Sequence, residues 1–76
     1  MKTPYLHILC LAIDTMADVN IDREGSLVHD SGLYCWIADD QIAFQTEDRE
    51  WSVPFVLSGN IIDDLTNFRH IVYDQL

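Results

Sequence analysis

The chain has 76 residues, which leaves room for a single compact domain with a small core and no room for a second domain. Hydrophobic residues make up 49% of it, too many for a disordered chain, although the formal net charge is −9. Thirteen acidic residues oppose four basic ones, and the resulting negative field repels phosphate backbones and anionic membranes. Direct binding to nucleic acid or to a membrane is therefore not expected. The same field attracts basic proteins, although solubility alone is a competing explanation of the charge.

The two cysteines, Cys10 and Cys35, are too few for the disulfide framework of a small secreted domain, so reduced thiols are expected. The apolar run 5–13 is interrupted by His7 and is too short to span a bilayer. No small-residue cleavage pair follows it, and Cys10 lacks the preceding small residue of a bacterial lipid-modified cysteine. These features favour an unprocessed cytoplasmic protein, in the cytoplasm of a bacterial host if a phage encodes it.

The N-terminal segment begins with Thr3-Pro4, a pair typical of helix starts because Thr can cap free amides and Pro fits the first helical position. The spacing predicts a helix over about 4–19. Its expected buried face consists of Leu6, Leu9, Cys10, Ile13 and Ala17. A buried strand over 5–13 is the alternative, but Leu, Ala, Cys and Met favour the helix. The segment 20–32 that follows is rich in Asp and Gly and is predicted to be a loop, with a short edge strand at 26–29 as an alternative.

The central segment 33–57 contains three apolar runs separated by two acidic turns, Asp39-Asp40 and 47–50, which predicts a three-stranded antiparallel meander. Alternation places one set of side chains on the face that is expected to be core: Leu33, Cys35, Ile37, Ile42, Phe44, Trp51, Val53, Phe55 and Leu57. Pro54 cannot donate a hydrogen bond to a neighbouring strand and therefore suits an edge strand or a bulge.

The second face of this meander is less polar than a solvated face should be, because it carries Tyr34, Trp36, Ala43 and Val56. Either one helix covers each face of the sheet, or the second face is open and binds a partner. We expect a helix on each face, because so short a chain can spare few apolar residues from its core.

The C-terminal segment predicts a second helix, with Asn60 as its N-cap and an apolar stripe formed by Ile61, Leu65, Phe68 and Val72. The overall prediction is an α+β fold. A three-stranded antiparallel meander, or a four-stranded one if 26–29 adds a strand, carries an N-terminal and a C-terminal helix, in the order α-(β)-β-β-β-α.

No phosphate-binding loop, nucleophile elbow or metalloprotease motif is present, so no catalytic function is expected. His7, Cys10, His29 and Cys35 are the right residue types for zinc, but their spacing matches no familiar zinc module. No cofactor is therefore expected, and buried thiols with exposed imidazoles remain the simpler interpretation.

The acidic residues recur at turns and helix starts, which favours a protein-binding module that engages a basic protein surface, most naturally that of a nucleic-acid-binding protein. The candidate contact residues are Asp39, Asp40, Glu47, Asp48, Glu50, Asp63 and Asp64, with Tyr34 and Trp36 as aromatic anchors. In size and charge the chain is similar to small acidic phage inhibitors of host defence, including anti-CRISPR and DNA-mimic proteins, and to antitoxins, although no motif carries this similarity. The alternative is a structural or adaptor module, a homodimer rather than a monomer, that self-associates through the Tyr34/Trp36 face.

Overall fold

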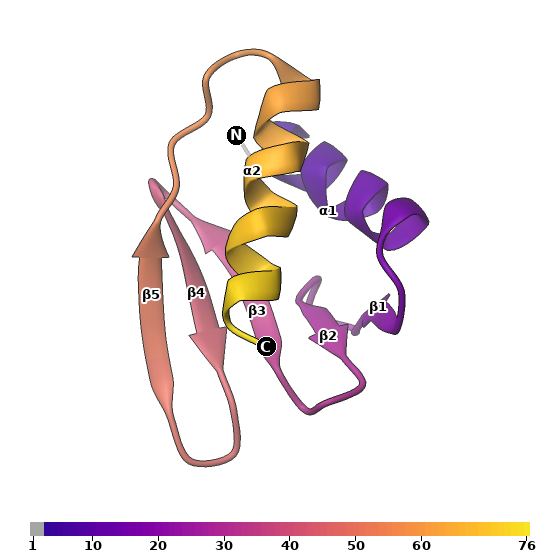
Figure 1. Ribbon diagram of the computed structural model, residues 1–76, viewed down its shortest axis with the longest axis vertical. Helices are drawn as coiled ribbons and strands as arrows, with labels where there is room; N and C mark the ends of the chain where they lie inside the picture. The colour runs from indigo at the N-terminus through magenta and orange to yellow at the C-terminus, as the bar shows by residue number, and fades with distance from the viewer. Residues whose placement is uncertain (1–2) are drawn as a thin grey trace.

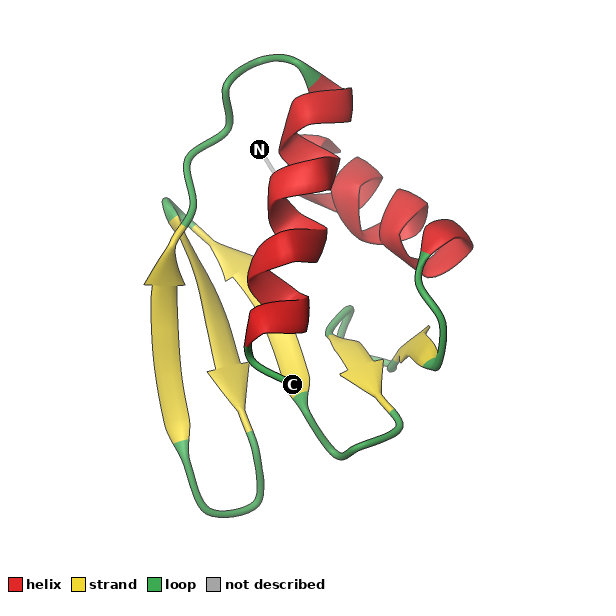
Figure 2. Ribbon diagram, viewed as in Figure 1, coloured by secondary structure: helices red, strands yellow, loops and turns green. Residues whose placement is uncertain are grey.

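The computed structural model describes residues 3–76, and side chains from His7 onward. Within residues 3–76 the chain order is one helix, five strands and a second helix, and the five strands form a single sheet (Figures 1 and 2). The elements are α1 (Thr3–Thr15), β1 (Val19–Ile21), β2 (Leu27–His29), β3 (Tyr34–Ala38), β4 (Gln41–Gln45), β5 (Glu50–Pro54) and α2 (Ile61–Asp74). The predicted α+β class is confirmed, but the sheet has five strands, not three or four.

The sheet is an antiparallel meander in which each strand pairs with the next, in the order β1-β2-β3-β4-β5. The β3–β4 and β4–β5 pairs are the longest, with Cys35 opposite Phe44 and Phe44 opposite Trp51. These cross-strand neighbours place large apolar side chains side by side on the core face. Pro54 lies in edge strand β5, as predicted. The next residue, Phe55, donates its backbone N–H to Asp40 O at 2.8 Å. Because the N–H groups of successive strand residues point to opposite sides, an N–H at position 54 would point away from β4, so its absence in Pro54 leaves no strand hydrogen bond unmade.

The segment 20–32, predicted to be mainly a loop, contains most of a hairpin formed by β1 and β2. Its turn is closed by the Asp22 carboxylate, which accepts the N–H groups of Glu24 at 3.0 Å and Ser26 at 2.9 Å, while Gly25 adopts φ +84°. A polar turn ending in Gly is a hairpin signal, and the short apolar runs at 19–21 and 27–28 flank this turn. The alternative strand at 26–29 is thus real, but β1 covers its outer edge.

Both helices pack on the same face of the sheet. The buried apolar side chains form one cluster that includes Ile8 and Ala12 of α1, Phe68 of α2, and Cys35 and Phe44 of the sheet. Figure 1 shows α2 crossing the sheet with α1 beside it. The expectation that one helix covers each face is therefore wrong. Two helices packed against each other and one sheet face make one thick core, whereas one helix on each face would divide the same residues between two thin cores.

Helix α1 is shorter than predicted and is rotated relative to its predicted orientation. It ends at Thr15, and Asp18 adopts a left-handed conformation with φ 63° that turns the chain into β1. Among the side chains described, which begin at His7, the buried ones are Ile8, Leu9 and Ala12 of α1 and Met16 just after it, while Cys10 and Ala17 are exposed and Ile13 is half-buried. The predicted burial of Leu6 lies outside the described side chains. In a nearly continuous apolar run, several stripes have helical spacing, so periodicity alone does not select the correct one.

Helix α2 begins as predicted. The Asn60 side chain accepts the N–H groups of Ile62 and Asp63, and Leu65, Phe68 and Val72 are buried. Ile61, assigned to the same stripe, is 39% exposed because it lies at the helix start beyond the sheet. No helix within residues 3–76 is long and apolar enough to cross a membrane.

Replacing Phe68 with Ala tests the shared core. Phe68 is fully buried and packs edge-on against Phe55 with ring centroids 6.0 Å apart. The cavity left by the substitution should lower the free energy of unfolding by about 3–5 kcal/mol, measured by urea denaturation. Val56→Ala, at a position 70% exposed, should change it by less than about 0.5 kcal/mol. Equal losses in the two variants would contradict the packing described here.

Candidate interaction surfaces

The two acidic turns of the meander lie at opposite ends of the sheet. Asp39 and Asp40 form the two-residue β3–β4 connection, in which Asp39 adopts a left-handed conformation with φ 54°. Glu47 and Asp48 lie in the β4–β5 turn, closed by the hydrogen bond from Thr46 N to Arg49 O at 2.9 Å. All four carboxylates are exposed. The structure therefore does not bring the predicted acidic residues together into one patch, but holds two pairs on ordered turns.

The basic residue of the β4–β5 turn is already engaged. The Arg49 guanidinium lies 4.3 Å from the centre of the Trp51 ring, which stacks on Phe44 at a centroid distance of 5.5 Å. A cation over an aromatic face is held by the ring's negative potential. Glu50 follows as the first residue of β5 and is exposed. The carboxylates of this turn thus remain outward while its cation lies against Trp51.

The two acidic residues of α2 differ in environment. Asp63 is exposed, but Asp64 is only 3% exposed, and its Oδ1 accepts hydrogen bonds from Ser58 N at 2.9 Å and Ser58 Oγ at 2.8 Å. Asp64 therefore holds the β5–α2 connection against the start of the helix, where the helix dipole also favours a negative charge. It is not available to a partner, and we exclude it from the contact surface.

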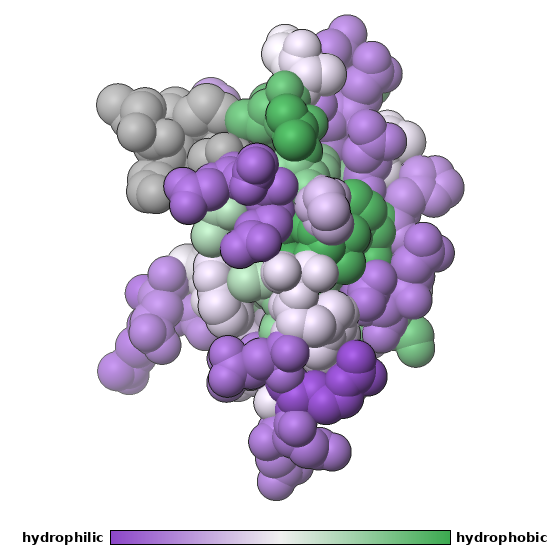
Figure 3. Space-filling model, turned by 90° about the vertical axis from the view of Figure 1, so that its left-hand side faces the viewer, coloured by the Kyte–Doolittle hydropathy of each residue, from purple (hydrophilic) through white to green (hydrophobic). Residues whose placement is uncertain are grey.

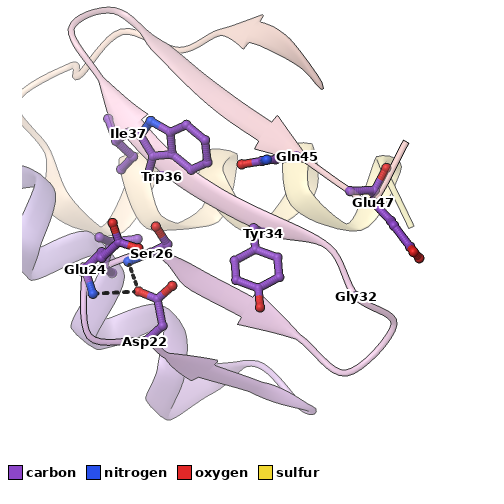
Figure 4. A pocket seen from close by; sticks show the side chains of 12 residues that line it. Asp22, Glu24, Ser26, Gly32, Tyr34, Trp36, Ile37, Gln45 and Glu47 are labelled. Carbon is purple, nitrogen blue, oxygen red and sulfur yellow. Dashed lines mark hydrogen bonds between the residues drawn. The ribbon is translucent and has the colours of Figure 1, made fainter. Parts of the chain in front are cut away.

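The sheet face opposite the helices carries Tyr34 and Trp36, and no other element within residues 3–76 covers it. Tyr34 is 42% exposed and Trp36 is half-buried. A groove of about 820 Å³ runs over these two side chains, between the β1–β2 turn and the end of β4 (Figure 4). We call it the Tyr34/Trp36 groove. This face is therefore open and is not covered by a helix of the described chain.

The groove exists because β2 pairs with β3 at only two positions, Leu27 with Cys35 and Val28 with Tyr34. Beyond that point the β1–β2 turn diverges from β3, and Leu9 and Ile37 contribute to the lining where the strands separate. The groove therefore has an apolar floor, although it opens on the sheet face that is otherwise solvent-exposed.

Carboxylates stand at the rim of this groove. Asp22 and Glu24 come from the β1–β2 turn and Glu47 from the β4–β5 turn, and none of the described lining residues is basic. Sequence reasoning missed the contribution of Asp22 and Glu24 because it treated 20–32 as a loop. The sequence signal for this hairpin, and so for the position of the two carboxylates, is the Asp22-to-Gly25 turn between the short apolar runs at 19–21 and 27–28.

The two cysteines lie in different environments. Cys10 is exposed on α1 and Cys35 is buried in β3. Among the residues that the structure describes, no three His, Cys, Asp or Glu side chains are placed to hold a metal ion. Burial raises the pKa of the Cys35 thiol to about 12, so it stays protonated near neutral pH and is a poor nucleophile.

Thiol labelling checks this difference between the cysteines. At pH 8 an aromatic disulfide reagent should modify about one thiol per folded chain, since Cys10 is exposed while the pKa of Cys35 lies far above the working pH. Cys10→Ser should abolish that fast reaction, and unfolding in guanidinium should restore reactivity at Cys35. Rapid modification of two thiols in the folded chain would contradict the burial of Cys35.

Comparison with protein-family models, curated proteins and solved structures finds no significant match for this chain. The charges, the exposed carboxylates and the Tyr34/Trp36 groove are therefore the features of the chain that bear on its function.

Proposed function

We propose that this chain is a small acidic protein-binding module, an inhibitor that occupies a basic, nucleic-acid-binding surface of another protein. The observation that carries the proposal is the distribution of charge on a folded surface. All thirteen acidic side chains are exposed except the half-buried Asp22 and the buried Asp64. Figure 3, which views the molecule from the β5 side, shows hydrophilic residues arranged around a central area of hydrophobic and neutral ones.

Ordered turns make these carboxylates more effective than the same charges on a disordered tail. The turns at 39–40 and 47–48 are parts of a hydrogen-bonded sheet, so binding would cost little additional backbone entropy. A basic groove that accepts a series of phosphates could accept such fixed carboxylates in their place, and the net charge of −9 would accelerate the encounter. Asp39, Asp40, Glu47, Asp48, Glu50 and Asp63 form the proposed electrostatic contact surface.

The small size and strong acidity also support a biological setting for the proposal. Phage-encoded inhibitors of host defence, such as anti-CRISPR and DNA-mimic proteins, and antitoxins share these two properties. In that setting the chain would act in the cytoplasm of a bacterial host as a monomer or homodimer. The support here is size and charge, not a shared motif.

The open Tyr34/Trp36 face favours a second candidate, a homo-oligomerising adaptor. Such a dimer would bury apolar area, but it would also bring together the groove carboxylates of two copies, each with a net charge of −9. This repulsion weakens with salt, so a dimer of this kind should form more readily at about 0.5 M salt than at about 0.05 M. Sedimentation at the two salt concentrations separates the candidates, because the inhibitor should sediment as the same species at both.

The direct test of the inhibitor is capture from a lysate of the native host at low salt, followed by elution with a salt step. The eluted protein is then assayed for duplex DNA binding with and without the acidic chain. The proposal expects the chain to compete with the DNA. An eluted partner that binds nucleic acid equally well in the presence of excess chain would overturn it.

Charge substitutions on the turns should weaken that complex more than equal substitutions elsewhere. The variant D39N/D40N/D48N removes three carboxylates of the two turns, whereas the control D14N/D18N/D74N removes three exposed carboxylates in or next to the helices, outside the proposed contact surface. We expect the turn variant to lose at least tenfold in affinity at about 0.1 M salt, and the helix variant to lose less than threefold. Calorimetric titration measures both. Binding that persisted at about 1 M salt would argue against an electrostatic interface.

A further inference from the structure

The two aromatic side chains of the Tyr34/Trp36 groove are spaced regularly along strand β3. Tyr34 and Trp36 are two residues apart on β3, so their side chains point to the same face and are about 7 Å apart along the strand. An extended peptide lying along the groove places alternate side chains at the same interval. The floor is therefore matched to an extended segment that presents every second side chain to it.

The charges at the rim indicate what those side chains should be. Glu24 and Glu47 are exposed and lie toward opposite ends of the groove (Figure 4). Asp22 is less available, because its Oδ1 already accepts two backbone N–H groups. A cationic side chain near each end would meet a carboxylate, whereas an acidic segment would be repelled by both.

Arginine fits this combination better than lysine does. Its planar guanidinium stacks on aromatic rings and binds a carboxylate with two parallel N–H groups, whereas the lysine ammonium is a compact, strongly hydrated charge. The chain itself contains an arginine over an aromatic ring elsewhere, since the Arg49 guanidinium lies 4.3 Å from the Trp51 ring centre. On the open face, Trp36 and Tyr34 lie in a groove lined by no basic residue of the described chain.

We propose that the Tyr34/Trp36 groove binds an extended segment of the partner protein that carries arginines at alternate positions, Arg-X-Arg. The guanidinium groups stack over Trp36 and Tyr34 and pair with Glu24 and Glu47 at the two ends. This inference rests on the proposed function, since it assigns a binding site to the basic partner. It adds to the turn carboxylates a site in which spacing, not charge alone, selects the ligand.

The test uses the intact chain, labelled with ¹⁵N, and the peptide Ac-Gly-Arg-Gly-Arg-Gly-NH₂. Titration should shift the Trp36 indole N–H and the amides of Glu24, Tyr34 and Glu47, and leave those of Asp39 and Asp40 nearly unchanged. Trp36→Phe assigns its indole signal against that of Trp51. Shifts centred on the 39–40 turn, or none in the groove at millimolar peptide, would overturn the assignment.

Three control peptides test chemistry and spacing. Citrulline in place of both arginines keeps the shape but removes the charge, and should bind at least tenfold more weakly. Ac-Gly-Gly-Arg-Arg-Gly-NH₂ keeps the charge but directs adjacent arginines to opposite sides of an extended peptide, and should bind several-fold more weakly. Lysine in place of arginine should weaken binding about threefold or more. Equal affinity for the adjacent-arginine or lysine peptide would overturn the spacing or the arginine assignment, respectively.

A matched pair of variants tests which carboxylates bind the arginines of the peptide. E24Q/E47Q and D39N/D40N each remove two carboxylates, and Asn tolerates the left-handed conformation at position 39. The groove variant should bind the Arg-X-Arg peptide at least tenfold more weakly, and the turn variant less than twofold more weakly. Trp36→Leu, which keeps an apolar floor without the aromatic face, should bind about 3- to 30-fold more weakly. Equal losses in the two charge variants would overturn the groove and show a response to net charge alone.

The DNA-competition and peptide-titration experiments can fail independently. If the chain displaces the partner from DNA through the turn carboxylates but the peptide causes no shifts in the groove, the proposed function stands and the groove site is overturned. Groove shifts with the expected peptide order, but no DNA-competing partner in the lysate, would retain the site and overturn the inhibitor. Concentration-dependent shifts of the groove signals without peptide would show that a second copy occupies this face, and would overturn the inference.

Discussion

Both helices pack on one face of the sheet, and this arrangement determines which side chains are buried and which face stays open. A 76-residue chain has few large apolar side chains, and a single shared core buries Phe44, Phe68, Ile8, Leu27 and Ile42 almost completely. A sheet flanked by one helix on each side would spread these residues over two thinner layers with more exposed apolar edge. The consequence is that the opposite face, with Tyr34 and Trp36, remains uncovered by the described elements. The feature that stabilises the fold thus also creates the candidate binding surface.

The sequence predicted the central meander and α2 well because their signals are local. Strict alternation over 33–57 identifies the buried face through Cys35 and Phe44, and a cap followed by a clean stripe identifies α2. It failed where a local pattern has several solutions. Most residues of the run 5–16 are apolar, so the buried stripe of α1 is decided by contact with α2 and the sheet, which no local pattern contains. Strands of three residues, as in β1 and β2, carry too little alternation to stand out from a polar loop.

The candidate site was only partly predictable for the same reason. Exposed acidic turns can be recognised from sequence because Asp and Glu between strands are usually solvated, and this holds for Asp39, Asp40, Glu47 and Asp48. Asp64 shows the limit of this reasoning. It follows Asp63 directly, yet it is buried and satisfied by Ser58, because only the helix phase distinguishes the two. That Glu24, Trp36 and Glu47 line the same groove depends on the divergence of β2 from β3, a tertiary feature without a sequence signature.

In the proposed function, charge and shape would contribute to recognition of the partner through two different parts of the molecule. Exposed carboxylates on turns act over about 10 Å at 0.1 M salt, so they speed the encounter with any basic surface but discriminate poorly among such surfaces. A groove with two aromatic side chains at strand spacing acts only on contact, and it discriminates by the geometry of the ligand. The two parts need not depend on each other for stability, because Tyr34, Glu24 and the turn at 39–40 lie outside the buried cluster. Substitutions there can therefore alter binding while leaving the shared core of the two helices and the sheet intact.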